Sequence, residues 1–185
     1  MVKHVQLPLT EETARGLQAG DQVLLSGAVF TGRDAAHKRL IALLDEGKPL
    51  PVNLEGETIY YVGPAPARPG QAVGPAGPTS SYRMDPYTPK LLDLGLKGMI
   101  GKGERGTEVI DAMKQHGAVY FGAVGGSAVL ISRSIEKSEL IAYPDLGPEA
   151  IHRFVIKDFP AVVVIDSQGN NLYQQGPELY RKTDL

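Results

Sequence analysis

The densest group of chemically active side chains follows a long loop rich in glycine and proline. Nine of the sixteen residues from 63 to 78 are Gly or Pro, and TSSYRMD follows directly at residues 79–85. In it, Thr79 offers a hydroxyl and Arg83 a guanidinium that can hold a carboxylate by two hydrogen bonds. Asp85 is either a partner for that arginine or a cap for the next helix. Because such long loops in compact domains are usually functional or disordered, this stretch predicts an anion site, with a turn of ordinary polar residues as the alternative.

A second candidate is the sequence GRD at residues 32–34, where an expected strand passes into an expected helix. Arg33 could dock a carboxylate beside the free N–H groups and positive dipole end of that helix. The alternative is that Asp34 caps the helix and Arg33 is only solvated. His37 falls in the first helical turn near the apolar face, so we expect it to pack or to hydrogen-bond.

A third candidate is GMIGKGERG at residues 98–106, where Lys102 stands between two glycines. Glycines let a ligand approach the backbone, and lysine supplies a point charge for an anion. The spacing is not that of a phosphate-binding P-loop. The glycine-rich stretch 122–128 is explained equally well by close packing of a strand against a helix. Together, Arg33, Arg83 and Lys102 suit a small dicarboxylate, whereas no catalytic Ser-His-Asp spacing or carboxylate pair is present.

Apolar periodicity indicates the elements that must position these groups. Strands are expected at 5–9, 21–32, 57–63, 97–103 and 118–124. Helices are expected at 34–47, 87–96, 107–117 and 125–135, the first beginning at Asp34 and ending at Gly47. Residues 138–146 and 153–160 are expected to be extended or mixed, and 161–173 to form a strand, a turn and a strand. This order predicts an α/β fold with a mixed sheet.

The bulk composition restricts the class of protein. A chain of 185 residues with 42% hydrophobic content predicts one globular domain over residues 1–185. A formal net charge of -2 argues against a nucleic-acid partner. No segment has the composition of a signal peptide or a membrane span, so we expect a cytoplasmic protein and no membrane. The chain has no cysteine and four scattered histidines, so it predicts no metal site of its own.

Five stretches taken in order resemble one family. They are GRDAAHK, the loop YYVGPAPARPGQAVGPAGPTSSYRMDPYTPKLL, GLKGMIGKGERG, GAVYFGAVGGSAVL and DFPAVVVIDSQGN. These five stretches identify the chain as similar to the C-terminal region of class I (iron-sulfur) fumarate hydratases. In many organisms this region is a separate beta subunit, and it shares its pattern with the beta subunit of L(+)-tartrate dehydratase.

The resemblance implies a swivelling β/β/α domain, similar to the mobile domain of aconitase-like enzymes. It also implies an alpha subunit whose three cysteines hold a 4Fe-4S cluster, so that this chain binds none. A hetero-oligomer is then expected, with a homodimer possible when the chain is alone. The implied reaction is the reversible hydration of fumarate to (S)-malate. Dehydration of L(+)-tartrate to oxaloacetate is the alternative, and a non-catalytic anion-binding module is an answer of another class.

The resemblance also implies roles for single residues. Arg33, Arg83 and Lys102 match family positions that bind carboxylate or hydroxyl oxygens of the substrate. Thr79 matches the threonine proposed to act at the carbon that gains or loses a proton. The family more often has a second threonine next, where this chain has Ser80. Three residues are expected to have supporting roles: His37, Asp34 and Asp85. We expect the loop 63–78 to contact the alpha subunit and to be partly mobile without it.

Overall fold

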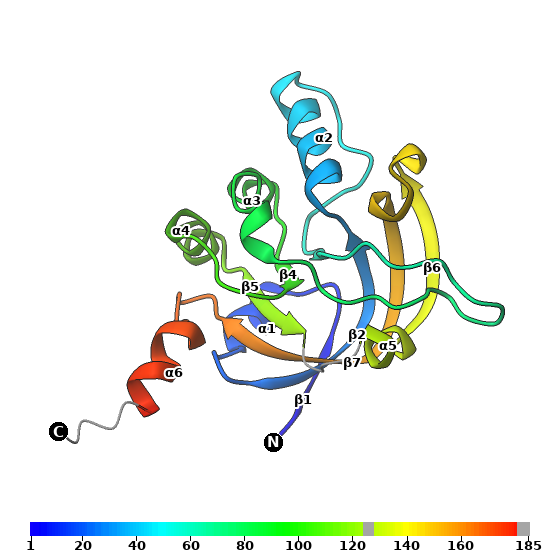
Figure 1. The fold of residues 1–185 in the computed structure, drawn as a ribbon. Helices are drawn as coiled ribbons and strands as arrows, with labels where there is room; N and C mark the ends of the chain where they lie inside the picture. The colour runs from blue at the N-terminus through cyan, green and yellow to red at the C-terminus, as the bar shows by residue number, and fades with distance from the viewer. Residues whose placement is uncertain (124–127, 181–185) are drawn as a thin grey trace.

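The computed structural model describes residues 1–123 and 128–180. The strands are β1 (Lys3–Gln6), β2 (Gln22–Thr31), β3 (Thr58–Tyr60), β4 (Gly98–Gly101), β5 (Val119–Ala123), β6 (Ile135–Ala142) and β7 (Ile151–Ile165). The helices are α1 (Glu11–Gly16), α2 (Asp34–Asp45), α3 (Thr88–Asp93), α4 (Thr107–His116), α5 (Ala128–Arg133) and α6 (Leu172–Tyr180). Two short 3-10 helices are η1 (Ser81–Met84) and η2 (Pro144–Glu149). Figure 1 shows their arrangement.

The strands form one mixed sheet that folds back on itself. Their order is β1-β2-β3-β4-β5-β7-β6, with a further pairing of β2 with β7. The strands β1 to β5 pair parallel to one another, while β7 is antiparallel to β2, β5 and β6. Because β7 bonds to both β2 and β5, the strands β2, β3, β4, β5 and β7 close into a ring. The predicted mixed α/β fold is therefore confirmed.

Side chains alternate between two hydrophobic cores along the central strands. In β3 and just after it, Tyr60 enters the core enclosed by the strands, whereas Ile59 and Tyr61 face the core under the helices. In β5, Phe121 and Tyr120 divide in the same way. A strand with apolar residues on both faces is buried on both sides. One core thus lies between strands, and the other lies between strands and a layer of helices.

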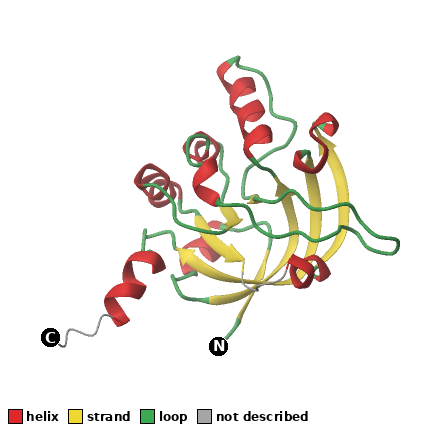
Figure 2. Ribbon diagram, viewed as in Figure 1, coloured by secondary structure: helices red, strands yellow, loops and turns green. Residues whose placement is uncertain are grey.

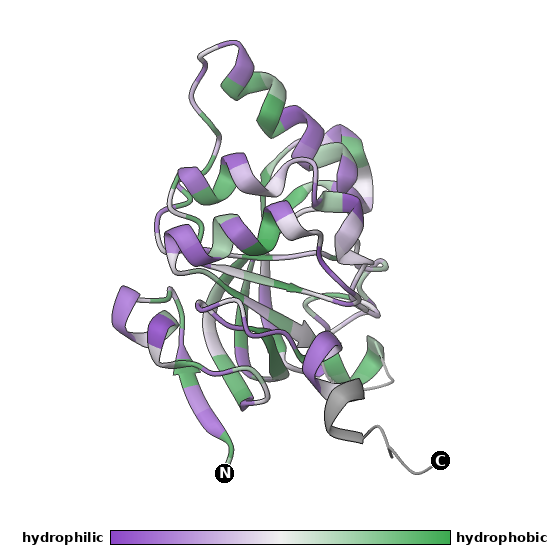
Figure 3. Cartoon of the chain, turned by 90° about the vertical axis from the view of Figure 1, so that its left-hand side faces the viewer, coloured by the Kyte–Doolittle hydropathy of each residue, from purple (hydrophilic) through white to green (hydrophobic). Residues whose placement is uncertain are grey.

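The helices α2, α3 and α4 cover the outer face of the parallel strands (Figures 1 and 2). Each contributes apolar residues to the outer core, such as Leu40, Leu91 and Met113. Figure 3 shows hydrophilic and hydrophobic bands alternating along these helices, as expected for elements with one buried face. Within the described ranges, no helix is long and apolar enough to cross a membrane.

The ends of α2 agree with the prediction at one terminus only. Gly47 follows the C-cap Glu46 with a φ of +68°, a left-handed conformation that favours glycine and stops the helix. The prediction that Asp34 caps the helix is wrong. Arg33 occupies the N-cap position without a side-chain capping bond, and Asp34 is the first helical residue. The carboxylate of Asp34 is bonded to Arg83 instead, which a local reading of the sequence does not reveal.

The predicted hairpin at the end of the chain is also wrong. Strand β7 ends at Ile165, and Asp166 closes a turn by accepting hydrogen bonds from the backbone N–H groups of Gln168 and Asn170. Asn171 forms only an isolated bridge with Ile165. Its side chain accepts a hydrogen bond from the backbone N–H of Tyr173 at 3.0 Å, and a helix begins. The short helix α1 was likewise not predicted, because six residues show too little periodicity.

The loop 63–78 is an extended segment whose outgoing and returning sides are joined by backbone hydrogen bonds. Ala65 donates its N–H to Pro75, and Gly74 donates back to Ala65. The phenol of Tyr60 donates to the carbonyl of Ala76 at 2.5 Å, which ties the returning side to the inner core. The tip projects beyond β6 in Figure 1. Of the expected helix 125–135, Ala128–Arg133 is helical, and residues 124–127 lie outside the described residues.

Candidate active site

The candidate residues gather where the parallel strands end. Thr31 of β2 pairs with Tyr60 of β3, and Tyr60 pairs with Ile100 of β4, so these strands finish side by side. Arg33 follows the first of these ends and Lys102 the third. The carboxyl ends of strands are where open α/β sheets usually bind ligands. Two of the three predicted cations are therefore placed at one edge by the topology.

The returning end of the loop joins this edge through backbone hydrogen bonds. Thr79 donates its N–H to the carbonyl of Tyr61 at 2.7 Å. Ser80 forms a parallel bridge with Lys102, and Ser81 donates its N–H to the carbonyl of Lys102 at 2.9 Å. Thr79 and Lys102 are thus held on neighbouring segments, as the anion-site interpretation requires.

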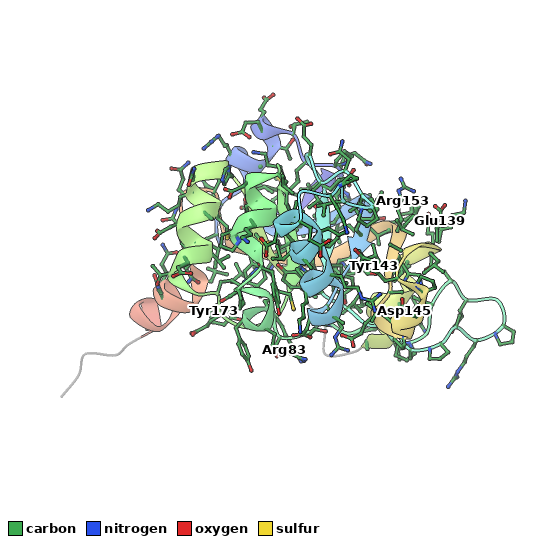
Figure 4. All side chains as sticks on the ribbon, turned by 90° about the horizontal axis from the view of Figure 1, so that it is seen from above. Arg83, Glu139, Tyr143, Asp145, Arg153 and Tyr173 are labelled. Atoms are coloured by element: carbon green, nitrogen blue, oxygen red, sulfur yellow. The ribbon has the colours of Figure 1, made fainter. Side chains whose placement is uncertain are left out.

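Arg83, in η1, reaches the start of α2. Its Nε donates to Oδ1 of Asp34 at 3.0 Å, and its Nη2 lies 2.8 Å from Oδ2. The two side chains are 42% and 31% exposed. This ion pair brings Arg83 to the residue next to Arg33, so all three predicted cations belong to one surface. In Figure 4, Arg83 lies on the rim of the molecule.

Arg33 has a carboxylate neighbour that the sequence did not indicate. Its Nε lies 3.5 Å from Oε1 of Glu149, in η2. A Cβ atom added at Gly63 would lie 3.0 Å from Nη1 of Arg33, so the absence of a side chain there leaves space for the guanidinium. Glu149 was missed because it stands far along the chain in a short 3-10 helix, where a glutamate normally indicates only a solvated surface.

Two of the predicted groups have no partner in the part of the chain that the structure describes. The Lys102 side chain is exposed and makes neither an ion pair nor a hydrogen bond there. The hydroxyl of Thr79, which is half-buried, makes no hydrogen bond there either. Both groups are therefore chemically available at an edge where Arg33 and Arg83 are already held by carboxylates.

His37 is a buried residue that hydrogen-bonds to the N-cap of α2. It is 1% exposed, and its Nδ1 lies 2.8 Å from the carbonyl oxygen of Arg33. Burial lowers the pKa of His37 to about 4, so the ring is neutral near pH 7. Because a carbonyl only accepts, the single ring proton is on Nδ1. His37 thus fixes the backbone of Arg33 and packs against Tyr61, in line with the expected packing and hydrogen bonding.

Asp85 holds a buried cation, and both alternatives predicted for it are wrong. It neither pairs with Arg83 nor caps α3, whose N-cap is Tyr87. Its Oδ1 accepts a hydrogen bond from Nε of Arg105 at 2.7 Å, and its Oδ2 accepts one from the N–H of Gly106 at 2.7 Å. Asp85 therefore links the segment of Arg83 to the segment that follows Lys102.

Arg105 is a buried residue of the site that the sequence analysis did not single out. Its side chain is 0% exposed, and its Nη2 donates to the hydroxyl of Thr88 at 2.9 Å. The guanidinium carbon lies 5.3 Å from the ring centre of Tyr61 and 5.1 Å from that of Tyr120. Such cation–π contacts stabilise a buried charge. An arginine between a glutamate and a glycine gives no sign of burial in the sequence.

The site does not fit an iron-sulfur cluster or another metal by itself. The chain has no cysteine. Over residues 1–123 and 128–180, no three His, Asp or Glu side chains are grouped as metal ligands would be. The edge carries cations and hydroxyls, which suit an anionic ligand.

Comparison with known proteins decides the family. The sequence profile described as Fumarase C-terminus matches residues 1–176. The chain belongs to the fumarase C-terminus family. The resemblance identified from the five sequence motifs is thereby confirmed.

Relatives within the fumarase C-terminus family differ in length. The chain is 44% identical over 153 residues to "Fumarate hydratase class I, anaerobic" of Escherichia coli K12, covering 82% of this chain and 28% of that protein. It is 39% identical over 175 residues to "Putative fumarate hydratase class I" of Geobacillus stearothermophilus, covering 92% and 33%. The chain thus spans a third or less of these two curated relatives.

A relative of similar length has a different printed name. The "Putative L(+)-tartrate dehydratase subunit beta" of Methanocaldococcus jannaschii is 32% identical over 181 residues, covering 94% of this chain and 93% of that protein. A chain of this length thus corresponds to nearly the whole of that relative and to a third or less of the two fumarate hydratases.

Proposed function

We propose that this chain is the beta subunit of a two-subunit class I fumarate hydratase, which interconverts fumarate and (S)-malate together with an alpha subunit. One observation carries the proposal: Arg33, Arg83, Lys102 and Thr79 meet at one edge of the parallel strands of a fumarase C-terminus domain. The nearly full-length match to a protein named as a subunit beta supports the two-chain arrangement.

Substrate binding is assigned to the three cations. An arginine can hold a carboxylate through two parallel N–H groups, and a lysine adds a mobile point charge. Arg33 and Arg83 keep 27% and 42% of their side chains exposed, so a carboxylate can reach them beside Glu149 and Asp34. The two carboxylates offset part of the three positive charges. We infer that the alpha subunit supplies further groups to balance a dianionic substrate.

The proposed reaction requires two contributions from this chain: stabilisation of negative charge, and a group that passes the proton to or from carbon. Hydration of fumarate forms a C–O bond at one carbon and a C–H bond at its neighbour, through negative charge that spreads onto a carboxylate. Cations placed on that carboxylate lower the barrier. Thr79 is assigned to the protonated carbon. A threonine hydroxyl is a weak acid and base, so a group of the alpha subunit must exchange the proton with it.

The 4Fe-4S cluster belongs to the alpha subunit in this proposal, because the described residues of this chain do not fit one. A swivelling motion of the domain and a cytoplasmic location belong to the proposal too, as does contact of the loop 63–78 with the alpha subunit. That loop projects from the sheet, and its projecting part is rich in exposed Pro and Ala side chains.

L(+)-tartrate dehydratase is the second candidate, favoured by the relative of similar length. Its substrate carries one more hydroxyl than malate and has the same two carboxylates. The edge formed by Arg33, Arg83 and Lys102 suits either substrate, so the distinction depends on groups that contact the extra hydroxyl.

Reconstitution tests both candidates. The chain is mixed with its cognate cluster-loaded alpha subunit, and rates are measured with fumarate, (S)-malate and L(+)-tartrate. We expect fumarate and malate to interconvert, and the isolated chain to be inactive. A higher kcat/KM for L(+)-tartrate would favour the second candidate. Inactivity of a verified complex with all three substrates would reject both, and tight fumarate binding by the chain alone would then indicate a non-catalytic anion-binding module.

A further inference from the structure

The backbone that carries Lys102 is held on three sides. The carbonyl of Lys102 accepts the N–H of Ser81 at 2.9 Å. At the next residue, the phenol of Tyr120 lies 2.8 Å from the carbonyl oxygen of Gly103. The N–H of Gly103 donates to the phenol oxygen of Tyr173 at 3.1 Å. We call Tyr120 and Tyr173, which bind the carbonyl and the N–H of Gly103 from two elements, the tyrosine clamp.

The proton positions around Tyr120 follow from its partners. The carbonyl of Gly103 can only accept, so the phenol of Tyr120 donates its one proton there. The hydroxyl of Ser81 lies 2.8 Å from the same phenol oxygen and must therefore donate to it. Burial raises the pKa of Tyr120, which keeps this proton in place. A directed chain thus runs from Ser81 through Tyr120 to Gly103 and joins the two segments of the site.

Tyr173 completes the clamp from outside. It belongs to α6, is 41% exposed, and lies on the same rim as Arg83 in Figure 4. Gly103 has a φ of +83°, which suits glycine and gives the turn its shape. Water can replace the exposed phenol of Tyr173 more easily than the buried phenol of Tyr120. Loss of Tyr120 is therefore expected to have the larger effect.

We propose that Tyr120 and Tyr173 are positioning residues, which fix Gly103 by its carbonyl and its N–H and so hold the ammonium group of the preceding Lys102 where a substrate carboxylate binds. The inference rests on the proposed function for the identity of the substrate. The physical basis of the inference is that the Lys102 side chain has no partner among the described residues. Only the position of the Lys102 backbone therefore restrains the ammonium group. The flexible four-carbon side chain of a lysine samples a smaller volume when its backbone is fixed.

The first test examines the clamp without any activity. Amide hydrogen exchange at Gly103 is measured in the full chain for Tyr173→Phe, Tyr120→Phe and Tyr143→Phe. Tyr143 is the matched control, because its buried phenol oxygen has no hydrogen-bond partner in the described structure. We expect exchange at Gly103 to become several-fold faster in the first two variants and to stay unchanged in the control. Unchanged exchange in both clamp variants would overturn the proposal.

The second test asks whether the clamp acts through Lys102. In the complex with the alpha subunit, kcat/KM for fumarate is measured for Tyr120→Phe, Lys102→Ala and the double variant. We expect Tyr120→Phe alone to lower kcat/KM by about tenfold, mainly through KM, and to have little further effect once Lys102 is absent. Additive losses would show that Tyr120 acts elsewhere and would overturn the proposal.

The outcomes separate this inference from the proposed function. If the unmodified complex acts on neither fumarate nor L(+)-tartrate, the proposed function fails, and the substrate role of the clamp fails with it. If the unmodified complex is active but Tyr120→Phe behaves like Tyr143→Phe, the clamp alone is rejected.

Discussion

Arg83 holds Asp34 through two nitrogens, Nε at 3.0 Å from Oδ1 and Nη2 at 2.8 Å from Oδ2. The contact joins η1 to the first residue of α2 and places two arginines, Arg33 and Arg83, at one helix start. Both remain partly exposed. Asp34 therefore orients a cation that a substrate can still reach.

Replacing Arg83 with lysine keeps the charge and removes the planar fork. We expect kcat/KM for fumarate to fall by about 10- to 100-fold, since a hydrogen bond to a charged group contributes about 1.5–3 kcal/mol. Steady-state kinetics of the reconstituted complex measure this loss. Arg39→Lys is the matched control, because Arg39 also bonds both oxygens of one carboxylate, that of Asp145, and is not one of the three predicted substrate-binding cations. Similar losses in both variants would contradict a substrate role for Arg83.

The sequence predicted the parts of the fold that depend on local patterns. The apolar spacing of α2 and the glycine that ends it sufficed to place Arg33 at a helix start. The alternation of strands and helices predicted a mixed sheet. In the structure β2, β3 and β4 run parallel in that sheet, and their shared edge brings Arg33 and Lys102 together. The backbone pairing of Ser80 with Lys102 completes that edge.

The remaining errors concern partners chosen by tertiary packing. Asp34 was predicted to cap α2, and Asp85 to pair with Arg83 or to cap the next helix. In the structure Arg83 bonds Asp34, and Asp85 bonds Arg105. These choices depend on how η1 lies between α2 and the end of β4. The burial of Arg105 depends on the rings of Tyr61, just after β3, and Tyr120, in β5. No local pattern encodes either relationship.

His37 predicts a pH dependence of stability. Its pKa is lowered by burial from 6.5 to about 4 in the folded chain, so the unfolded chain binds a proton first as the pH falls. Stability is then lost between about pH 6.5 and pH 4, by about 3 kcal/mol in total from this group. Urea unfolding of the chain and of His37→Gln at pH 5 and pH 7.5 measures the difference. Equal pH slopes in the two proteins would contradict the prediction.

Breaking the buried pair of Arg105 and Asp85 is expected to destabilise the fold strongly. Arg105→Met leaves the Asp85 carboxylate, which is 19% exposed, without its cation, and such a loss costs about 3–5 kcal/mol. Lys90→Met removes an exposed pair with Asp45 and is expected to cost less than about 1 kcal/mol. Urea unfolding midpoints of the two variants are compared. A small effect of Arg105→Met would mean that the cation is not buried as described.

Gly101, the last residue of β4, tests the close approach of the loop to the strand end. A Cβ atom at this position would lie 2.0 Å from Oγ of Ser81 and 2.9 Å from a ring carbon of Tyr61. Gly101→Ala therefore forces Ser81 away from Lys102 and Tyr120. We expect a loss of about 1–3 kcal/mol in the free energy of unfolding, together with weaker substrate binding.

The control is Gly16→Ala, because a Cβ atom there meets nothing within 4 Å and Gly16 lies at the end of α1. That change is expected to alter stability by no more than about 0.5 kcal/mol. Urea unfolding and the KM for fumarate are measured for both variants. If Gly101→Ala lowers stability but leaves KM unchanged, the loop contact stabilises the fold without positioning the site. If the two variants are equally stable, the close approach of Ser81 to β4 is wrong.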